Sequence, residues 1–190
     1  MAIGDAASVR SMYDDCAASL FAYLARRVGR ELAEDLLAET FRTAIESYPK
    51  FDSTRGSQKA WLFGIATNLL RRHWRTERRR LFAFERSAAM TATHIDPLIG
   101  LADGVAIRID AETDAARLLK AVADLPADDR DLLFLSGWER LNSREIGQAL
   151  GVAPATVRSR LHRIRADLRT TIDSLPVSSE SPTGATQWTY

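Results

Sequence analysis

A helix-turn-helix pattern between residues 141 and 165 constrains the fold of this chain more than any other feature. Asn142 or Ser143 can cap a first short helix, which Gly151 ends because glycine readily adopts a left-handed conformation. Pro154 then starts a second helix, where its missing N–H group costs nothing. Apolar residues recur on this second helix at helical spacing, at Val157, Leu161, Ile164 and Leu168. One buried stripe is therefore expected along it.

The face opposite this stripe is basic and indicates contact with DNA. Five arginines on the second helix stand against a single acidic residue, Asp167. Guanidinium groups suit bidentate contacts with phosphate and with guanine. The predicted groove-facing residues are Arg158, Ser159, His162 and Arg163, with Arg160 and Arg165 flanking the stripe. An ordinary helical hairpin with a solvated basic face is the alternative, and the concentration of arginine after a sharp turn favours DNA.

The overall charge does not oppose this interpretation. The chain has 26 Lys and Arg against 25 Asp and Glu, a net charge of +1, but the basic residues gather in two short stretches. A DNA-binding protein needs a local basic field, not a high total charge. Cys16 is the single cysteine, so an intramolecular disulfide is impossible. We find no signal-peptide pattern and no apolar run of about 20 residues, and we expect a cytoplasmic protein.

The rest of the pattern predicts an all-α protein with two small helical domains. Helices are expected at 9–27, 31–48 and 57–80, and again at 112–125 and 130–138 before the helix-turn-helix. Asp128 or Asp129 is the expected start of the helix at 130–138. The predicted divisions are a first domain at 8–82, a linker at 83–111, a second domain at 112–175 and a disordered tail at 176–190. The linker could extend on the order of 90 Å at ~3.3 Å per residue.

The third helix changes character along its length. Its start, WLFGIA at 61–66, is apolar on more than one face and should be central to a bundle. Its end, at 71–80, carries six arginines with Glu77 as the one acid, and Trp74 lies among them. A solvated helix end is one interpretation. Stacking of Trp74 on unpaired bases, with arginines on the phosphates, is the favoured one.

Together these segments resemble bacterial RNA polymerase sigma factors of the extracytoplasmic-function group. The resemblance covers about 9–80 and 112–169. It rests on DLLAETF at 35–41, WLFGIATN at 61–68, LPADDR at 125–130, and EIGQALG at 145–151 followed by TVRSRLHR at 156–163. Any one motif is only suggestive, whereas four in this order are highly specific. Ala38 and Ala155 depart from the residues common in the family, and 69–72 lacks a frequent Asp, so no promoter sequence follows.

The resemblance implies partners and roles. Sigma region 2 would bind the coiled coil of the largest polymerase subunit and open the minus-10 element, and region 4 would bind the minus-35 duplex and the polymerase flap. Polymerase-binding residues would be Asp35, Glu39 and Arg42. Minus-10 residues would be Lys50, Arg55, Phe63, Asn68, Arg71, Arg72, Trp74 and Arg75. An anti-sigma factor is a further expected partner.

Two other classes of function, an enzyme and a stand-alone regulator, fit the sequence less well. An enzyme is disfavoured because the three histidines fall in separate segments and no metal-ligand spacing or paired carboxylates occur. We expect no catalytic residue, no metal, no cofactor and no small-molecule substrate. The alternative is a stand-alone helix-turn-helix regulator whose N-terminal helices bind an effector or dimerise. Residues 31–80 argue against it, because such a regulator needs no acidic helix, apolar helix and arginine run in that order.

Overall fold

The structure is a computed structural model that describes residues 3–54, 56–87 and 114–173. These residues form α-helices and one 3-10 turn, with no strand among them, which confirms the all-α prediction. The elements are α1 (Ile3–Val28), α2 (Arg30–Ser47), η1 (Tyr48–Lys50), α3 (Gln58–Ser87), α5 (Asp114–Asp124), α6 (Ala127–Gly137), α7 (Ser143–Leu150) and α8 (Pro154–Asp173). None of the described helices is long and apolar enough to cross a bilayer.

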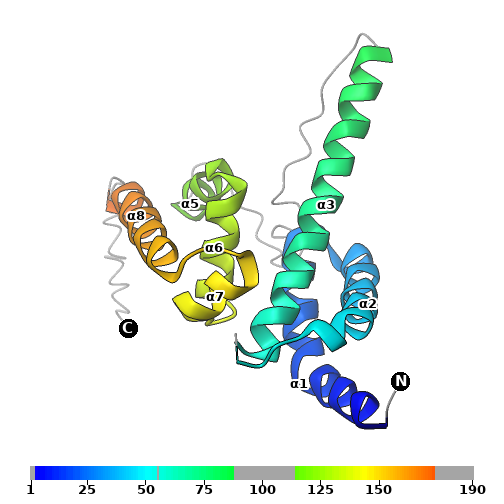
Figure 1. Cartoon of the computed structure of the whole chain (residues 1–190). Coiled ribbons are helices and arrows are strands. Elements are labelled where there is room, and N and C mark those ends of the chain that lie inside the picture. The colour runs from blue at the N-terminus through cyan, green and yellow to red at the C-terminus, as the bar shows by residue number, and fades with distance from the viewer. Residues whose placement is uncertain (1–2, 55, 88–113, 174–190) are drawn as a thin grey trace, which may run out of the picture.

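The N-terminal helices α1, α2 and α3 pack around the apolar start of α3. Leu62, Phe63, Ala66 and Leu70 are all fully buried there. Gly29 joins α1 to α2 with φ of 79°, a conformation that favours glycine. The central position predicted for the 61–66 segment is confirmed. The basic end of α3 extends well beyond α1 and α2 (Figure 1).

The C-terminal helices contain the predicted helix-turn-helix as α7 and α8. The Asn142 side chain accepts hydrogen bonds from the backbone N–H groups of Arg144 and Glu145 at 2.9 and 3.0 Å. The Glu145 carboxylate accepts in return from the Asn142 N–H at 2.9 Å, which completes a capping box. Gly151 ends α7 with φ of 69°, as expected for a left-handed cap. Val157, Leu161 and Ile164 are buried, which confirms the apolar stripe of α8.

The two groups of helices pack against each other chiefly through α3 and α7. A Cβ atom at Gly64 would lie 2.6 Å from the carbonyl oxygen of Ala149, so only glycine permits this approach. Leu132, Leu135 and Ile146 of the C-terminal helices belong to the same buried cluster as the core of α1 and α3. The described residues therefore share one continuous apolar core.

Three local expectations differ from the structure. Helix α3 continues to Ser87, into the segment predicted as linker, because no glycine or proline stops it before Pro97. Helix α6 starts at Ala127 with Pro126 as its N-cap, so neither Asp128 nor Asp129 caps it. Ile45 follows Leu37 and Phe41 at helical spacing and is therefore expected in the core, but it is 40% exposed on α2. The rest of the predicted linker and the tail from residue 176 lie outside the described residues.

Candidate nucleic-acid interface

The face of α8 that the sequence assigned to the minus-35 groove is open to solvent. Arg158, Ser159 and His162 are exposed, on the side away from the buried stripe. The Ser159 hydroxyl donates to the carbonyl oxygen of Thr156 at 3.0 Å and keeps its lone pairs toward solvent. Three neighbouring polar groups on one exposed helical face provide donors and acceptors for base edges.

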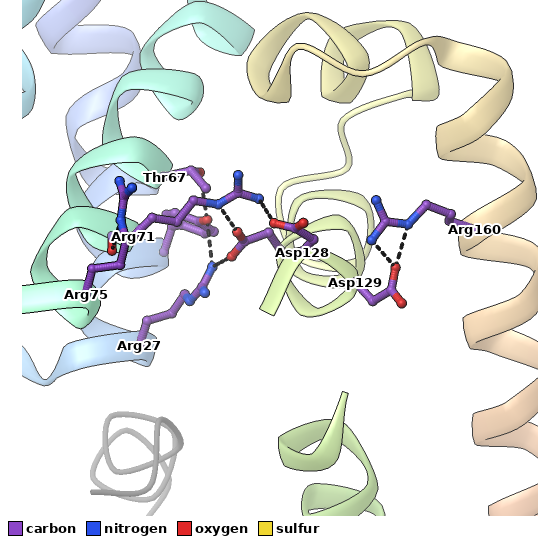
Figure 2. Close-up of polar contacts among 9 residues, drawn as sticks. Arg27, Thr67, Arg71, Arg75, Asp128, Asp129 and Arg160 are labelled. Atoms are coloured by element: carbon purple, nitrogen blue, oxygen red, sulfur yellow. Dashed lines mark hydrogen bonds and ion pairs between the residues drawn. The ribbon is translucent and has the colours of Figure 1, made fainter. Parts of the chain in front are cut away.

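The other three predicted minus-35 residues have partners on α6. Arg160 donates to one carboxylate oxygen of Asp129 through Nε at 2.7 Å, and its Nη2 lies 2.6 Å from the same oxygen in an ion pair. Arg163 reaches the second oxygen at 3.3 Å. Arg165 donates to the Ser136 hydroxyl at 2.7 Å. Figure 2 shows the Arg160 guanidinium directed at Asp129. The structure therefore anchors three of the six residues, Arg160, Arg163 and Arg165, to α6. Of these three, Arg163 and Arg165 are also exposed.

The residues predicted for the minus-10 element also divide. Asn68, Arg72 and Arg75 are exposed on α3, beyond its packed start. Trp74 is half-buried against the core, with its ring 5.3 Å from that of His73. Phe63 is fully buried, with its ring edge-on to Tyr23 at 5.4 Å, so its side chain offers no surface to DNA in this structure.

Two further residues of this set lie before α3. Lys50 is exposed at the end of η1. Arg55 lies outside the described residues. Lys50 thus adds an exposed cation to the N-terminal side of the predicted minus-10 surface.

Arg71 occupies the contact between the two groups of helices. Its Nε donates to Asp131 at 2.6 Å and its Nη2 lies 2.8 Å from Asp128. Asp131 is 1% exposed and also pairs with the buried Arg27 at 2.5 Å. Figure 2 shows Arg27 and Arg71 approaching α6 from α1 and α3. One carboxylate of α6 thus neutralises arginines from two N-terminal helices.

Hydrogen bonds extend this network into the core of the N-terminal helices. Arg27 donates to the Tyr23 hydroxyl at 2.8 Å, and that hydroxyl lies 2.9 Å from the Thr67 hydroxyl. Burial raises the pKa of Tyr23, so the phenol stays neutral. Burial alone would lower the pKa of Arg27, but Tyr23 and Asp131 together raise it. A buried arginine is retained here because its charge is paired and hydrogen-bonded.

A second ion pair lies at the end of α6. Arg26 contacts Glu139 at 2.7 Å, and its guanidinium lies 5.0 Å from the Trp138 ring centre. Lys59 of α3 donates to the Glu139 carbonyl oxygen at 3.2 Å. Burial raises the pKa of the Glu139 carboxyl, while Arg26 and Lys59 oppose the shift. The contact between the groups of helices is therefore charge-matched at both ends of α6.

The predicted polymerase-binding residues share one face of α2. Asp35 and Arg42 are exposed and Glu39 is half-buried. Arg42 forms ion pairs with Glu39 and Glu46 on the same helix. The hydrogen bonds from Arg42 lower the pKa of Glu39. This face stays charged, and its assignment to a partner remains a prediction.

The sequence interpretation missed the acidic first turn of α6. The pattern predicts Asp128 or Asp129 as helix starter and indicates no role for Asp131 or Arg27. Three aspartates within four residues, in a chain with two arginine-rich helices, was the available signal. Which arginine meets which aspartate depends on contacts between residues 31 to 104 positions apart, and periodicity does not report those.

Fold and exposed surfaces together define an all-helical DNA-binding protein with a helix-turn-helix. The chain matches the family Sigma-70 region 2 over residues 12–80 and Sigma-70, region 4 over residues 115–168. It is 30% identical to the ECF RNA polymerase sigma factor SigL of Mycobacterium tuberculosis over 93% of this chain and 96% of that protein. It is also 30% identical to the RNA polymerase sigma factor HrpL of Pseudomonas syringae, over 88% of each chain.

Solved structures give the same fold. The sigma factor RpoE of Bartonella quintana, in complex with the anti-sigma factor NepR, superposes with a TM-score of 0.61 at 23% identity, over 87% of this chain and 96% of that one. CnrH, in complex with the cytosolic domain of CnrY, gives a TM-score of 0.54 at 20% identity, over 87% of each chain. The chain belongs to the ECF group of RNA polymerase sigma factors. Proteins of this family are transcription-initiation factors and not enzymes in themselves.

Proposed function

We propose that α8 reads a duplex minus-35 element and that α3 holds the opened minus-10 strand. On α8 the base-reading residues are Arg158, Ser159 and His162, together with the part of Arg163 that stays exposed. The observation that carries this assignment is the exposure of these side chains on the face opposite the buried stripe. A helix after a sharp turn presents such a face to the major groove.

The minus-10 role rests on the shift of α3 from packed to exposed. Thr67 is fully buried while Asn68, the next residue, is exposed. Unstacking a base costs a few kcal/mol, and hydrogen bonds between the flipped base and a pocket must offset this cost. Asn68 supplies an amide donor and acceptor on a helix whose preceding turn is fixed in the core. Arg72 and Arg75 follow on the exposed part and are suited to the phosphates of the single strand.

Docking on core polymerase is assigned to α2. Asp35, Glu39 and Arg42 form a charged row on the exposed side of a helix whose other side packs on α1 and α3. A charged row of this kind suits an ion-paired contact with a coiled coil of the largest polymerase subunit. The flap of the polymerase is the corresponding partner of the C-terminal helices.

The two DNA-binding surfaces have to separate when both elements are bound. Arg71 contacts Asp128 and Arg160 contacts Asp129, so adjacent residues of α6 hold arginines of the two surfaces. Two sites one or two turns of duplex apart are separated by roughly 35–70 Å. In the packed arrangement the two arginines are held by adjacent residues of one helix, which brings their surfaces closer together than that. Promoter binding therefore requires the contact between α6 and the N-terminal helices to open, with residues 88–113 as the connection.

An anti-sigma factor is the further proposed partner. Two solved structures that share this fold each contain a second protein: RpoE is in complex with the anti-sigma factor NepR, and CnrH is in complex with the cytosolic domain of CnrY. A protein that holds the packed arrangement would keep both surfaces from reaching their elements. The identity of such a protein is to be found by capture with this chain.

Strand opening is the experiment that tests the minus-10 role assigned to Asn68 and α3. Promoters are first identified by sequencing transcripts that core polymerase makes in vitro with this protein on genomic DNA. Asn68→Ala should leave closed-complex binding nearly unchanged and should sharply reduce permanganate reactivity of thymines near the start site. A template with a pre-melted minus-10 bubble should restore much of the transcription.

The same experiment has clear contrary outcomes. If Asn68→Ala opens duplex promoter as well as wild type, Asn68 is not the pocket residue. If the mutant instead loses closed-complex binding to duplex promoter, Asn68 acts in duplex binding and not in strand opening. Ser11→Ala, at an exposed position of α1 to which no DNA or polymerase contact is assigned, is a matched control for loss of a small polar side chain.

A further inference from the structure

Asp129 is a buried acid whose carboxylate serves a different helix from its own. The residue is 4% exposed in the first turn of α6. Both of its oxygens face α8. Oδ1 accepts a hydrogen bond from Arg160 Nε at 2.7 Å and lies 2.6 Å from Arg160 Nη2, and Oδ2 accepts from Arg163 Nη2 at 3.3 Å. The N-cap of α6 is Pro126, so this carboxylate is not used to start its own helix.

The two arginines keep different amounts of free surface. The Arg160 side chain is 27% exposed and that of Arg163 is 63% exposed. Arg160 places two donors on a single oxygen, so its charge is neutralised within the protein. Arg163 contacts Asp129 through one nitrogen, and the other donors of its guanidinium remain available to another partner. The carboxylate thus withholds one arginine from solvent and fixes the direction of the other.

We propose that Asp129 is a positioning residue that sets the base specificity of α8. It holds Arg163 in the orientation in which it meets the groove and keeps Arg160 off the DNA backbone. This inference rests on the proposed minus-35 role of α8 and adds a residue on α6 to it.

The physical reason is the difference between contacts to phosphate and contacts to bases. A phosphate contact strengthens binding to every sequence, whereas a bidentate contact to guanine strengthens binding to one base pair. An unrestrained arginine at 160 would add affinity without discrimination. An arginine at 163 that is already oriented loses less side-chain freedom when it binds, which favours the matched base.

A structural role alone predicts a different result. The stripe of Val157, Leu161 and Ile164 already anchors α8 in the core. If Asp129 only fastened α8 to α6, its loss would weaken binding to matched and unmatched DNA in parallel. The proposal instead predicts that the two affinities change in different directions.

The experiment uses full-length protein in holoenzyme with core polymerase and measures equilibrium binding to two duplexes. One carries the minus-35 sequence selected by the wild-type holoenzyme from a randomised pool, and the other carries the same bases scrambled. Asp129→Asn should lower the ratio of the two affinities by roughly 5- to 100-fold, the range of one good bidentate contact. Its affinity for the scrambled duplex should hold or rise. The slope of log K against log salt concentration, called the salt dependence here, should become steeper by about 0.9, because Arg160 gains a phosphate contact.

Arg160→Met provides a second variant that keeps the packed stem and removes the charge. In the wild-type background it should leave the salt dependence unchanged, because Arg160 touches no phosphate there. In the Asp129→Asn background, Arg160→Met should remove the added salt dependence. The loss of discrimination should persist, because it comes from the unrestrained Arg163. Arg163→Gln should reproduce that loss of discrimination.

Several results would overturn the proposal. A parallel loss on both duplexes with an unchanged salt dependence would leave Asp129 a purely structural residue. If Arg160→Met alone lowers the salt dependence by about 0.9, Arg160 is a phosphate ligand in the wild-type protein and the proposal is wrong. This measurement is informative even if Asp129→Asn fails to fold. Arg158→Ala separates the two proposals, because it loses discrimination if α8 reads the groove, whatever Asp129 does.

Discussion

The two arginine-rich helices, α3 and α8, hold their guanidinium groups in different ways. Beyond Arg71, the arginines of α3 at 72, 75, 78 and 79 are exposed. Among the described residues, the hydrogen bonds and ion pairs of this stretch stay within α3, such as Arg75 to the Arg71 carbonyl at 3.3 Å and Arg80 to Glu77 at 2.8 Å. On α8, by contrast, Arg160, Arg163 and Arg165 bond to side chains of α6.

This difference matches the two proposed substrates. A single strand is flexible and presents its phosphates in many arrangements, so mobile arginines around a fixed helix suit it. A duplex groove presents its donors and acceptors in fixed places, so arginines held by a second helix suit it. Arg71 belongs to α3 by sequence but is anchored on α6, as the arginines of α8 are.

The largest expected effect comes from removing the acid that anchors Arg71. Asp131→Asn leaves Arg27 buried without its charged partner, and breaking a buried pair in this way costs about 3–5 kcal/mol. Thermal and urea unfolding of the full chain measure the loss. Asp128→Asn is the matched control: its side chain is 62% exposed, and it should cost below about 1 kcal/mol. Equal losses for the two variants would show that burial adds nothing to the anchoring of Arg71.

The next effect tests the exposed arginines of α3. The double change Arg72→Gln and Arg75→Gln should lower affinity of the holoenzyme for single-stranded minus-10 DNA by roughly ten- to a hundredfold at low salt. The salt dependence should fall by about 1.4, the value for two phosphates of a single strand. Arg10→Gln with Arg117→Gln removes the same charge from exposed sites on α1 and α5. A loss of the same size in this control would assign the effect to net charge, not to α3.

A smaller effect sets Arg158 of α8 against Arg72 of α3. Arg158→Ala should cost about 1–3 kcal/mol at one base pair of the minus-35 element and relax specificity there. Arg72→Ala should weaken binding by a similar factor on all sequences. Binding to a panel of single-base variants of the promoter distinguishes them. Uniform loss for Arg158→Ala would place Arg158 on phosphate and remove the contrast between the helices.

The smallest effect is a pH dependence at the Arg26–Glu139 contact. Burial raises the folded-state pKa of Glu139 above its ordinary value of 4.5. A carboxyl with a raised pKa favours the folded state when neutral, so its contribution is present below the unfolded-state pKa and is lost as pH rises through the folded-state pKa. The unfolding free energy of wild type minus that of Glu139→Gln should therefore fall as pH rises from about 4 to about 7. A rising difference would mean that the pair with Arg26 outweighs burial.

Much of the local structure could be predicted from the sequence because its causes are local. Asn142, Glu145 and Gly151 cap α7 through bonds to residues within a few positions. The spacing of Val157, Leu161 and Ile164 predicts their burial in any fold that packs α8. The exposed face of α8 follows from the same geometry. Phe63 shows the limit: the sequence placed it near the minus-10 strand, and the structure places it in the core against Tyr23.

The sequence by itself determined the all-α class, the caps of α7, the apolar stripe of α8 and the family to which the chain belongs. Tertiary structure alone decided which arginines are available to DNA. A guanidinium is available or neutralised according to the nearest carboxylate, and here those carboxylates come from Asp128, Asp129 and Asp131 on a different helix. Pairing across tens of residues depends on how α6 packs between α3 and α8, because the energy of an ion pair follows distance and burial and not position along the chain.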